Sequence, residues 1–417
     1  MNKQKKHFDT RIIHDCLCPE HWQGATLPPI YQCASHRHAT AKNLSDTFGG
    51  RTDDHIYMRL TNPTNRTLEK KLASLEGGRG AVAMSSGMAA ISNACLALLR
   101  TGDEFIAGKS LFMSTFCLFK NIFRRYGITP SFVESTDLTA IETAVNDKTR
   151  FIYLETIGNP KMDVPDLEAS AEIAHRHGLP LLVDNTLASP WLCRPFDFGA
   201  DIVIHSTTKY LSGHGDASGG IVIDRGDFNW DSEKFADFKP FIDRRGGLAY
   251  IDKVWREFHI NFGTTMAPLH SYLTMVGLDT LAVRLERHQE NSLKVANFLQ
   301  DRPEVKWVNY PGLSDSPFRQ TAVKQFRGKG FGAVLTFGLE NKDACFKFID
   351  NLEMIYHLAN LGDCKSLVIH PSSTQYLSFA NETKQELAIT DDLIRLSVGI
   401  EKVEDICADI AQALDAI

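Results

Sequence analysis

The sequence lacks the patterns that mark zinc proteases, disulfide-linked secreted proteins and membrane proteins. Its 417 residues include fifteen histidines but no HExxH pair, and its nine cysteines form no CxxC pair. No apolar run is long enough to span a bilayer, and the basic N-terminus leads into polar sequence rather than an apolar signal region. We therefore expect a soluble protein of the reducing cytoplasm, with no resident metal and no membrane contact.

Charge and complexity exclude further classes. The formal net charge of -6 disfavours nucleic acid as a partner, and we find no internal repeat or low-complexity tract. A chain of this length with 43% hydrophobic residues can bury a large core, and it is expected to divide into two domains plus an arm.

Apolar strand-like runs alternate with helical stretches between about residues 80 and 225. This is the rhythm of a mainly parallel α/β sheet. The strand-like runs are residues 81–85, 104–107, 151–154, 181–183 and 219–223, and the clearest helices are residues 88–100 and 166–177. Residues 224–247 are predicted to form an inserted surface loop. An amphipathic pattern from Leu269 to Leu299 should then lead into a second α+β domain.

Lys209 is the strongest chemical signal in the chain. It follows the apolar run 200–205 and lies among hydroxyl residues, including Ser206 and Thr208. An amine in this setting can form a Schiff base with an aldehyde cofactor while the hydroxyls bind its phosphate, which points to pyridoxal 5'-phosphate (PLP). A lone lysine would more often be a solvated surface residue, so further segments have to support the assignment.

Two other segments supply groups that PLP needs. Asp184 ends the apolar run 180–183, where a carboxylate can pair with the pyridine nitrogen, although a turn cap is an equally simple explanation. The string 85–90 reads as a strand-to-helix turn whose Gly87 and Met88 amides can bind a phosphate. Small residues at the start of an ordinary helix would look the same.

Together these strings resemble the Cys/Met-metabolism family of PLP enzymes, the cystathionine γ-synthase-like group of fold-type I. The resemblance covers nearly the whole chain. The strings that carry it, besides the Lys209 segment, are Thr26–Gln32, Tyr57–Thr64, Glu155–Pro160, Val183–Thr186 and Asp392–Gly399. It implies a mainly parallel seven-stranded sheet in a large domain at residues 58–285, a smaller C-terminal α+β domain at 286–417, and an N-terminal arm at 1–57.

The resemblance also implies residue roles. Tyr57 and Arg59 would bind the cofactor phosphate of a neighbouring subunit, so the unit would be a dimer at least and a homotetramer as a dimer of dimers. Asn159 would hydrogen-bond the ring hydroxyl, and Arg395 with Asn360 would hold the substrate carboxylate. Arg59 in a surface ion pair, Arg395 in an interdomain salt bridge and Asn360 as a backbone cap are the alternative interpretations.

Phe112 departs from the pattern, because most relatives have a tyrosine stacked over the cofactor. Phenylalanine can stack on the ring but has no hydroxyl to transfer a proton. The alternative is that Phe112 only packs and a different group transfers the proton. A carboxylate leaves without protonation more readily than a thiolate, so Phe112 favours an O-acyl substrate over a thioether.

The string 358–367 looks like O-acetylhomoserine sulfhydrylases. We therefore expect a PLP-dependent O-acyl-L-homoserine sulfhydrylase that uses sulfide or a thiol to make homocysteine or methionine. A methionine or cystathionine γ-lyase, an aminotransferase of the same fold type and a noncatalytic PLP-binding scaffold are the alternatives.

Overall fold

The computed structural model describes residues 6–417 and contains two sheets. The seven-stranded sheet has the order β1-β7-β6-β5-β4-β2-β3, and a five-stranded sheet has the order β10-β11-β12-β9-β8. Close packing divides the chain into two units. Unit 1 holds residues up to Leu98, Asp201–Ser212 and Asp216–Asp279, and unit 2 holds Leu99–Ala200, Gly213–Gly215 and Thr280–Ile417. These two units do not test the predicted domain boundaries at residues 57 and 285, which stay a prediction.

Unit 1 carries three strands in antiparallel pairs, in which β7 pairs with both β1 and β6. Its elements are α1 (Phe8–His14), α2 (Ala41–Phe48), α3 (Pro63–Glu76), β1 (Gly80–Met84), α4 (Gly87–Leu96), β6 (Ile202–His205), β7 (Gly220–Asp224), α9 (Lys239–Arg245), α10 (Ala249–Lys253), α11 (Ile260–Phe262) and α12 (Pro268–Asp279). Local sequence sets the ends of α3: Asn62 caps its first amides, Pro63 occupies the first turn, and Gly77 ends it with φ 92°.

The first part of unit 2 is parallel. Strand β2 (Glu104–Gly108) pairs with β3 (Thr129–Val133) and β4 (Thr149–Glu155), and β4 pairs with β5 (Leu181–Asp184). Helices α5 (Met113–Cys117), α6 (Leu138–Thr143), α7 (Leu167–Arg176) and α8 (Ser189–Leu192) connect or follow these strands. Strands β4 and β5 are almost wholly buried, which explains their continuous apolar sequence. The predicted mainly parallel sheet is confirmed.

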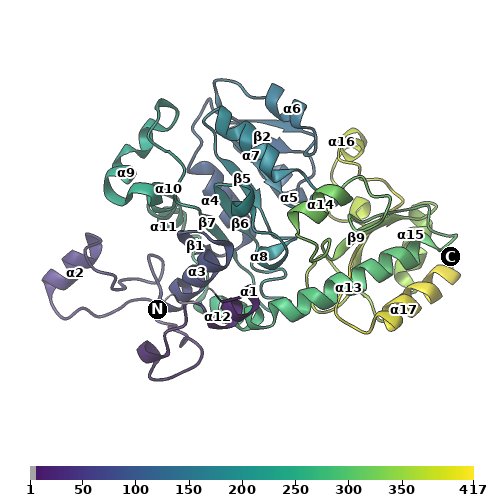
Figure 1. Cartoon of the computed structure of the whole chain (residues 1–417), viewed down its shortest axis with the longest axis horizontal. Helices are drawn as coiled ribbons and strands as arrows, with labels where there is room; N and C mark the ends of the chain where they lie inside the picture. Colours follow the sequence, from purple (N-terminus) through teal and green to yellow (C-terminus); the bar gives the residue numbers. More distant parts are fainter. Residues whose placement is uncertain (1–5) are drawn as a thin grey trace. The chain divides into compact units, whose positions relative to one another are not determined.

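The rest of unit 2 is the smaller α+β part. Strands β8 (Trp307–Asn309), β9 (Val334–Gly338), β10 (Tyr356–His357), β11 (Leu367–Ile369) and β12 (Leu393–Ser397) form the second sheet. Helices α13 (Leu281–Gln300), α15 (Lys342–Asp350) and α17 (Val403–Asp415) contribute to one apolar core with it (Figure 1). Helices α14 (Arg319–Gln325) and α16 (Asn381–Glu386) complete this part. The predicted second α+β region is thus confirmed.

Two sequence predictions are corrected. The pattern from Leu269 to Leu299 is two helices, α12 and α13, and on α12 the expected apolar positions Leu269 and Val276 are exposed. Helix α12 packs on α3, and it buries Ser271, Thr274, Met275 and Leu278 instead. The apolar period therefore marked the core face only in α13.

Residues 224–247 are not simply a surface loop. Trp230 stacks on Phe238 and Tyr250 at ring-centroid distances of 4.6 and 5.3 Å, and Phe235 and Phe241 are also buried. These aromatic side chains form a small core that includes the start of α9.

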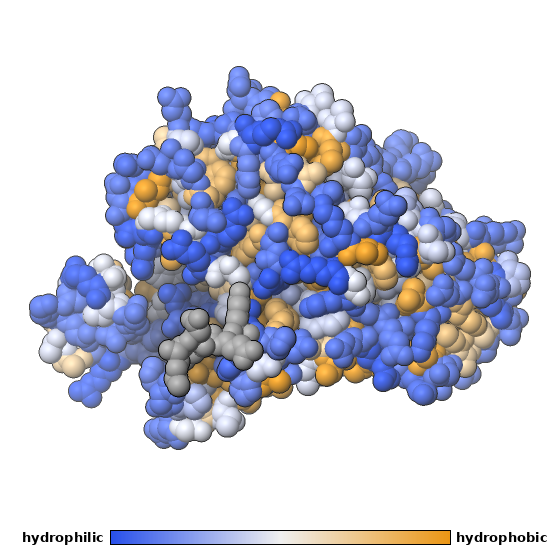
Figure 2. Space-filling model, in the orientation of Figure 1, coloured by the Kyte–Doolittle hydropathy of each residue, from blue (hydrophilic) through white to orange (hydrophobic). Residues whose placement is uncertain are grey.

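Hydrophilic residues dominate the face of the molecule drawn in Figure 2, with apolar residues scattered among them. Among the helices of residues 6–417, none has both the length and the apolar character that crossing a bilayer requires.

Candidate active site

The Lys209 loop is fixed to the start of β7. The Thr207 amide donates to the Gly219 carbonyl at 3.0 Å, and the Gly219 amide donates to Thr208 Oγ1 at 3.0 Å. Lys209 follows β6 directly and is partly buried, as are Ser206 and Thr208. The lysine is therefore not a freely solvated surface residue, and its hydroxyl neighbours are held in a fixed loop.

The turn between β1 and α4 packs against this loop so closely that it excludes side chains. A Cβ added at Gly87 would lie 2.7 Å from Ser206 Cβ, and one at Gly220 would lie 2.1 Å from the Ser86 carbonyl oxygen. Ser86 caps α4 by accepting from the Ala89 amide at 3.1 Å. The turn leaves Gly87 and Met88 partly buried at the positive end of a ten-residue helix. A helix start of this kind can bind an anion, and the predicted role of Gly87 and Met88 in phosphate binding stays a prediction.

Tyr57 and Arg59 lie on an exposed part of unit 1. The Arg59 guanidinium lies 5.7 Å from the centre of the Tyr57 ring, and its Nη1 donates to the Ile260 carbonyl at 2.6 Å. Within residues 6–417 it forms no ion pair, so the surface ion pair considered for Arg59 is absent there.

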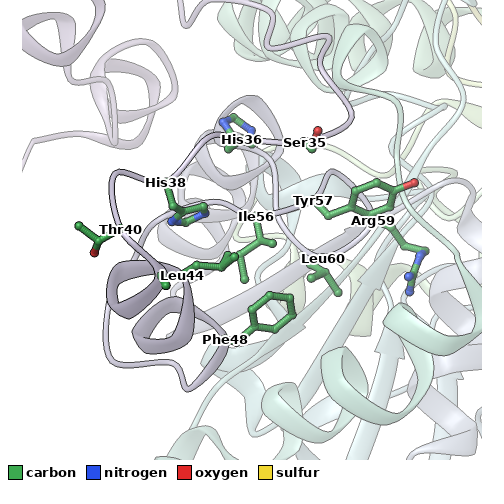
Figure 3. A pocket seen from close by; sticks show the side chains of 11 residues that line it. Ser35, His36, His38, Thr40, Leu44, Phe48, Ile56, Tyr57, Arg59 and Leu60 are labelled. Carbon is green, nitrogen blue, oxygen red and sulfur yellow. The ribbon is translucent and has the colours of Figure 1, made fainter.

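The exposed pair borders a cavity of about 690 Å³. In Figure 3, Leu44 and Phe48 of α2 reach toward Ile56 and Leu60, while Tyr57 and Arg59 lie at one end. The cavity thus combines apolar walls from the arm with a cation that has no acidic partner in the described chain.

Asp184 ends β5 in unit 2 and has 8% of its surface exposed. Its Oδ1 accepts from the Thr186 amide at 3.0 Å and from the Thr186 hydroxyl, and the Tyr153 hydroxyl donates to Oδ2 at 3.4 Å. The carboxylate therefore does cap its own turn. The same hydroxyl and amide donors fix the orientation of the carboxylate at the end of β5.

Phe112 stands at the start of α5, and its ring is partly buried without an aromatic partner among the described residues. Its amide donates to Glu155 Oε1 at 2.7 Å. Burial raises the pKa of the Glu155 carboxyl well above its usual value, the nearby charge of Asp184 adds to the shift, and the Phe112 hydrogen bond opposes it. Phe112 is therefore held through its backbone by Glu155, and its ring is left without an aromatic partner among residues 6–417.

Arg395, on β12, joins two other predicted residues. Its Nη1 donates to Asn159 Oδ1 at 3.1 Å and its Nη2 to the Asn360 carbonyl at 3.3 Å, while only 3% of Arg395 is exposed. A buried guanidinium oriented by two neutral oxygens is suited to clamp a planar carboxylate. In unit 2 the structure thus brings Arg395, Asn159 and Asn360 together.

Sequence reasoning gave no role to three groups in unit 2. Glu155, Tyr153 and Thr186 contact the predicted residues directly. Glu155 and Thr186 fall inside motif strings that were already singled out, and Glu155 ends a buried strand just as Asp184 does. Its position at the end of a buried strand could therefore have indicated Glu155 as a candidate site residue.

Comparison with known proteins identifies the family. The model of the Cys/Met metabolism PLP-dependent enzymes matches residues 9–415. A homocysteine/cysteine synthase of Saccharomyces cerevisiae is 40% identical, covering 99% of this chain and 98% of the relative. An O-acetyl-L-homoserine sulfhydrylase of Leptospira meyeri is 39% identical, covering 98% and 97%.

Solved structures agree. The Campylobacter jejuni structure named O-acetylhomoserine (thiol)-lyase, which carries N'-pyridoxyl-lysine-5'-monophosphate, has a TM-score of 0.93 and 32% identity, covering 98% of this chain and 100% of that one. The resemblance inferred from the motif strings is confirmed: the chain belongs to the Cys/Met metabolism family of PLP-dependent enzymes.

Proposed function

We propose that this enzyme is an O-acyl-L-homoserine sulfhydrylase that replaces the acyl group, acetyl in the first instance, with sulfide or a thiol. The products are homocysteine with sulfide and methionine with methanethiol. The observation that carries this proposal is the similarity, over nearly the full chain, to relatives named homocysteine synthase and O-acetyl-L-homoserine sulfhydrylase at 38–40% identity. The amino-acid substrate and the sulfur donor follow from it.

The residues of unit 1 fit the aldehyde and phosphate ends of PLP. Gly87 cannot carry a Cβ without meeting Ser206, so the turn keeps its amides open to an anion. We assign the phosphate to the amides of Gly87 and Met88 and to the hydroxyls of Ser206 and Thr208. Lys209 is the amine that bonds the cofactor aldehyde.

The residues of unit 2 fit the ring and the substrate. We assign Asp184 to the pyridine nitrogen, Asn159 to the ring hydroxyl, and Phe112 to the face of the ring. Arg395, with Asn360, holds the substrate α-carboxylate through its guanidinium fork. In this assignment Asn159 does two things: its side-chain oxygen accepts the hydrogen bond that orients Arg395, and the same side chain bonds the cofactor's ring hydroxyl.

The reaction requires an electron sink, a group that moves protons and a group that holds the substrate. Bound PLP supplies an electron sink for negative charge at the substrate α-carbon. The Lys209 amine would take the α-proton of the substrate and move protons between its carbons, a role that suits a lysine in a desolvated site. The Arg395 clamp would hold the substrate through its α-carboxylate. The acyl group leaves from the γ-carbon as a carboxylate, and the thiolate takes its place.

We further propose that active sites are shared between subunits of a homotetramer built as a dimer of dimers. In this arrangement Tyr57 and Arg59 of one subunit bind the phosphate in the next. The support is an exposed guanidinium that has no acidic partner among residues 6–417. The nine free thiols suit a cytoplasmic location.

A γ-lyase acting on methionine or cystathionine is the second candidate, because it uses the same cofactor residues. Phe112 counts against it, since a thiolate leaves with more need of a proton than a carboxylate does. A noncatalytic scaffold is disfavoured because Lys209, Asp184 and Arg395 are all present.

Product analysis tests the proposal. The PLP-loaded enzyme is incubated with O-acetyl-L-homoserine, with and without sulfide, and separately with L-methionine. Homocysteine that appears only with sulfide, and is lost in Lys209→Ala, supports the sulfhydrylase. Formation of α-ketobutyrate and ammonia from methionine without homocysteine synthesis would establish the lyase instead.

A further inference from the structure

Tyr376 is a buried tyrosine that no part of the reaction above uses. Only 2% of its surface is exposed, but that part includes the hydroxyl oxygen, which forms no hydrogen bond with any residue in the described range 6–417. A hydroxyl that no protein group occupies and that solvent can reach is able to donate a hydrogen bond to a bound ligand.

The backbone brings Tyr376 next to the substrate clamp. Ile369, the last residue of β11, pairs with Arg395 on β12, and the segment that carries Tyr376 leaves the sheet from this point. The Tyr376 amide donates back to the Pro371 carbonyl at 3.0 Å, which closes the turn. Tyr376 therefore follows the strand that pairs with the Arg395 strand, and the charge of Arg395 acts on its phenol.

Ring packing ties the same residue to the helix that begins after Phe112. Tyr376 packs edge-on against Phe379 with ring centroids 5.2 Å apart, and Phe379 lies 5.9 Å from Phe116 of α5. The Phe116 amide in turn donates to the Phe112 carbonyl at 3.0 Å. Tyr376 is thus linked to Arg395 on one side and to the Phe112 helix on the other.

The electrostatic surroundings keep the phenol protonated. Burial raises the pKa of Tyr376 well above its usual value. The Arg395 guanidinium opposes this shift, and Glu155 and Cys117 add to it. A tyrosine in this state donates a hydrogen bond and does not act as a base.

We propose that the Tyr376 hydroxyl donates a hydrogen bond to the acyl oxygen that leaves the substrate γ-carbon, which makes Tyr376 a catalytic residue in this enzyme. The inference rests on the proposed function. With the α-carboxylate on Arg395 and the ring contact at Phe112, a donor linked to both residues is placed for the γ-substituent. The hydroxyl would provide, from another element, the donor that phenylalanine at position 112 cannot provide.

The bond changes balance without a further reactant. The Cγ–O bond breaks and its electron pair stays on the oxygen, so the acyl group departs as a carboxylate. Tyr376 keeps its proton, because a phenol is a far weaker acid than a carboxylic acid. The hydrogen bond strengthens as charge develops on the leaving oxygen, so it lowers the barrier rather than improving binding.

Tyr376→Phe in the PLP-loaded enzyme tests this role. We expect kcat for homocysteine formation from O-acetyl-L-homoserine to fall about 10- to 150-fold, the range for losing a hydrogen bond to a charged group, with little change in KM. Exchange of the α-proton of L-homoserine with D₂O, followed by NMR, should keep its rate and its concentration dependence, because this amino acid has no acyl group. Tyr310→Phe, which removes a buried hydroxyl bonded to the Gly332 carbonyl, is the matched control and should keep full activity.

The outcomes separate the explanations. If Tyr376→Phe keeps its kcat for O-acetyl-L-homoserine, the inference is wrong, whatever the status of the proposed function. If α-proton exchange weakens in parallel with a higher KM, the hydroxyl binds the α-carboxylate and the leaving-group role is excluded. If the wild-type enzyme makes no homocysteine from this substrate, the proposed function has failed first.

Discussion

Gly87→Ala is the sharpest test of where the cofactor phosphate binds. The new Cβ would lie 2.7 Å from Ser206 Cβ and 3.1 Å from Ser206 Cα, well inside contact distance. In the free enzyme the Ser206 loop can shift to relieve the clash. If the phosphate is held by the Gly87 amide and the Ser206 hydroxyl together, PLP binding forces the two segments back against each other.

The size of the effect follows from the clash. Overpacking a well-packed site costs about 1–3 kcal/mol. If PLP binding has to restore the clash, the cofactor dissociation constant rises about 5- to 150-fold, since 1.4 kcal/mol is a factor of ten. Titration of the apoenzyme with PLP, followed by the cofactor absorbance, measures this constant directly.

A matched glycine separates cofactor binding from general destabilisation. A Cβ at Gly312 would lie 2.5 Å from the Tyr310 ring and 2.8 Å from Phe331, a comparable clash within the smaller part of unit 2. Gly312→Ala should lower the melting temperature and leave PLP affinity unchanged. If Gly87→Ala also lowers only the melting temperature, the turn is a packing feature and the phosphate binds elsewhere.

Three further predictions concern leaving-group chemistry, subunit sharing and stability. Phe112→Tyr would add a hydroxyl at the position we propose for the face of the cofactor ring. It should raise α-ketobutyrate release from L-methionine about tenfold or more, measured as keto acid. An unchanged rate would mean that the ring at this position does not limit thioether cleavage. Mixed oligomers of Arg59→Ala and Lys209→Ala chains should regain activity that neither variant has alone. In some sites one subunit then supplies the intact lysine and its neighbour supplies the intact arginine. If each active site were built within one chain, mixing the variants would restore no activity. Burial raises the pKa of Asp224 to about 7 in the folded protein. Its contribution to stability is therefore full below the unfolded pKa near 4 and is lost as pH rises through 7. Thermal melts of Asp224→Asn should lack the decline that the wild type shows between pH 4 and 7, and an identical decline in both proteins would refute this assignment.

Sequence alone predicted the groups that sit at the ends of buried strands. Lys209 and Asp184 each follow a continuous apolar run, and such runs place the next polar residue at the sheet edge where α/β proteins bind ligands. Gly87 was singled out because a strand-to-helix turn with glycine can hold a phosphate, although small residues at the start of an ordinary helix look the same. The structure adds the cause, which is the close approach of Ser206.

Residues whose role depends on contacts between distant segments left no local pattern. Tyr376 is one tyrosine in a polar segment, and only a buried ring with an accessible hydroxyl that no residue of 6–417 bonds singles it out. The aromatic side chains around Trp230 follow no helical or strand period, so their small core looked like a surface loop. The apolar period also ran on across Thr280, where α12 ends and the buried face changes.

The most direct test of the account is the partition of O-acetyl-L-homoserine between replacement and elimination at saturating sulfide. Homocysteine and α-ketobutyrate are quantified together against the substrate consumed. We predict about one homocysteine for each substrate molecule consumed and little α-ketobutyrate, because the thiolate captures the γ-carbon before water can intervene. Predominant α-ketobutyrate with sulfide present would contradict the assignment of this enzyme as a sulfhydrylase.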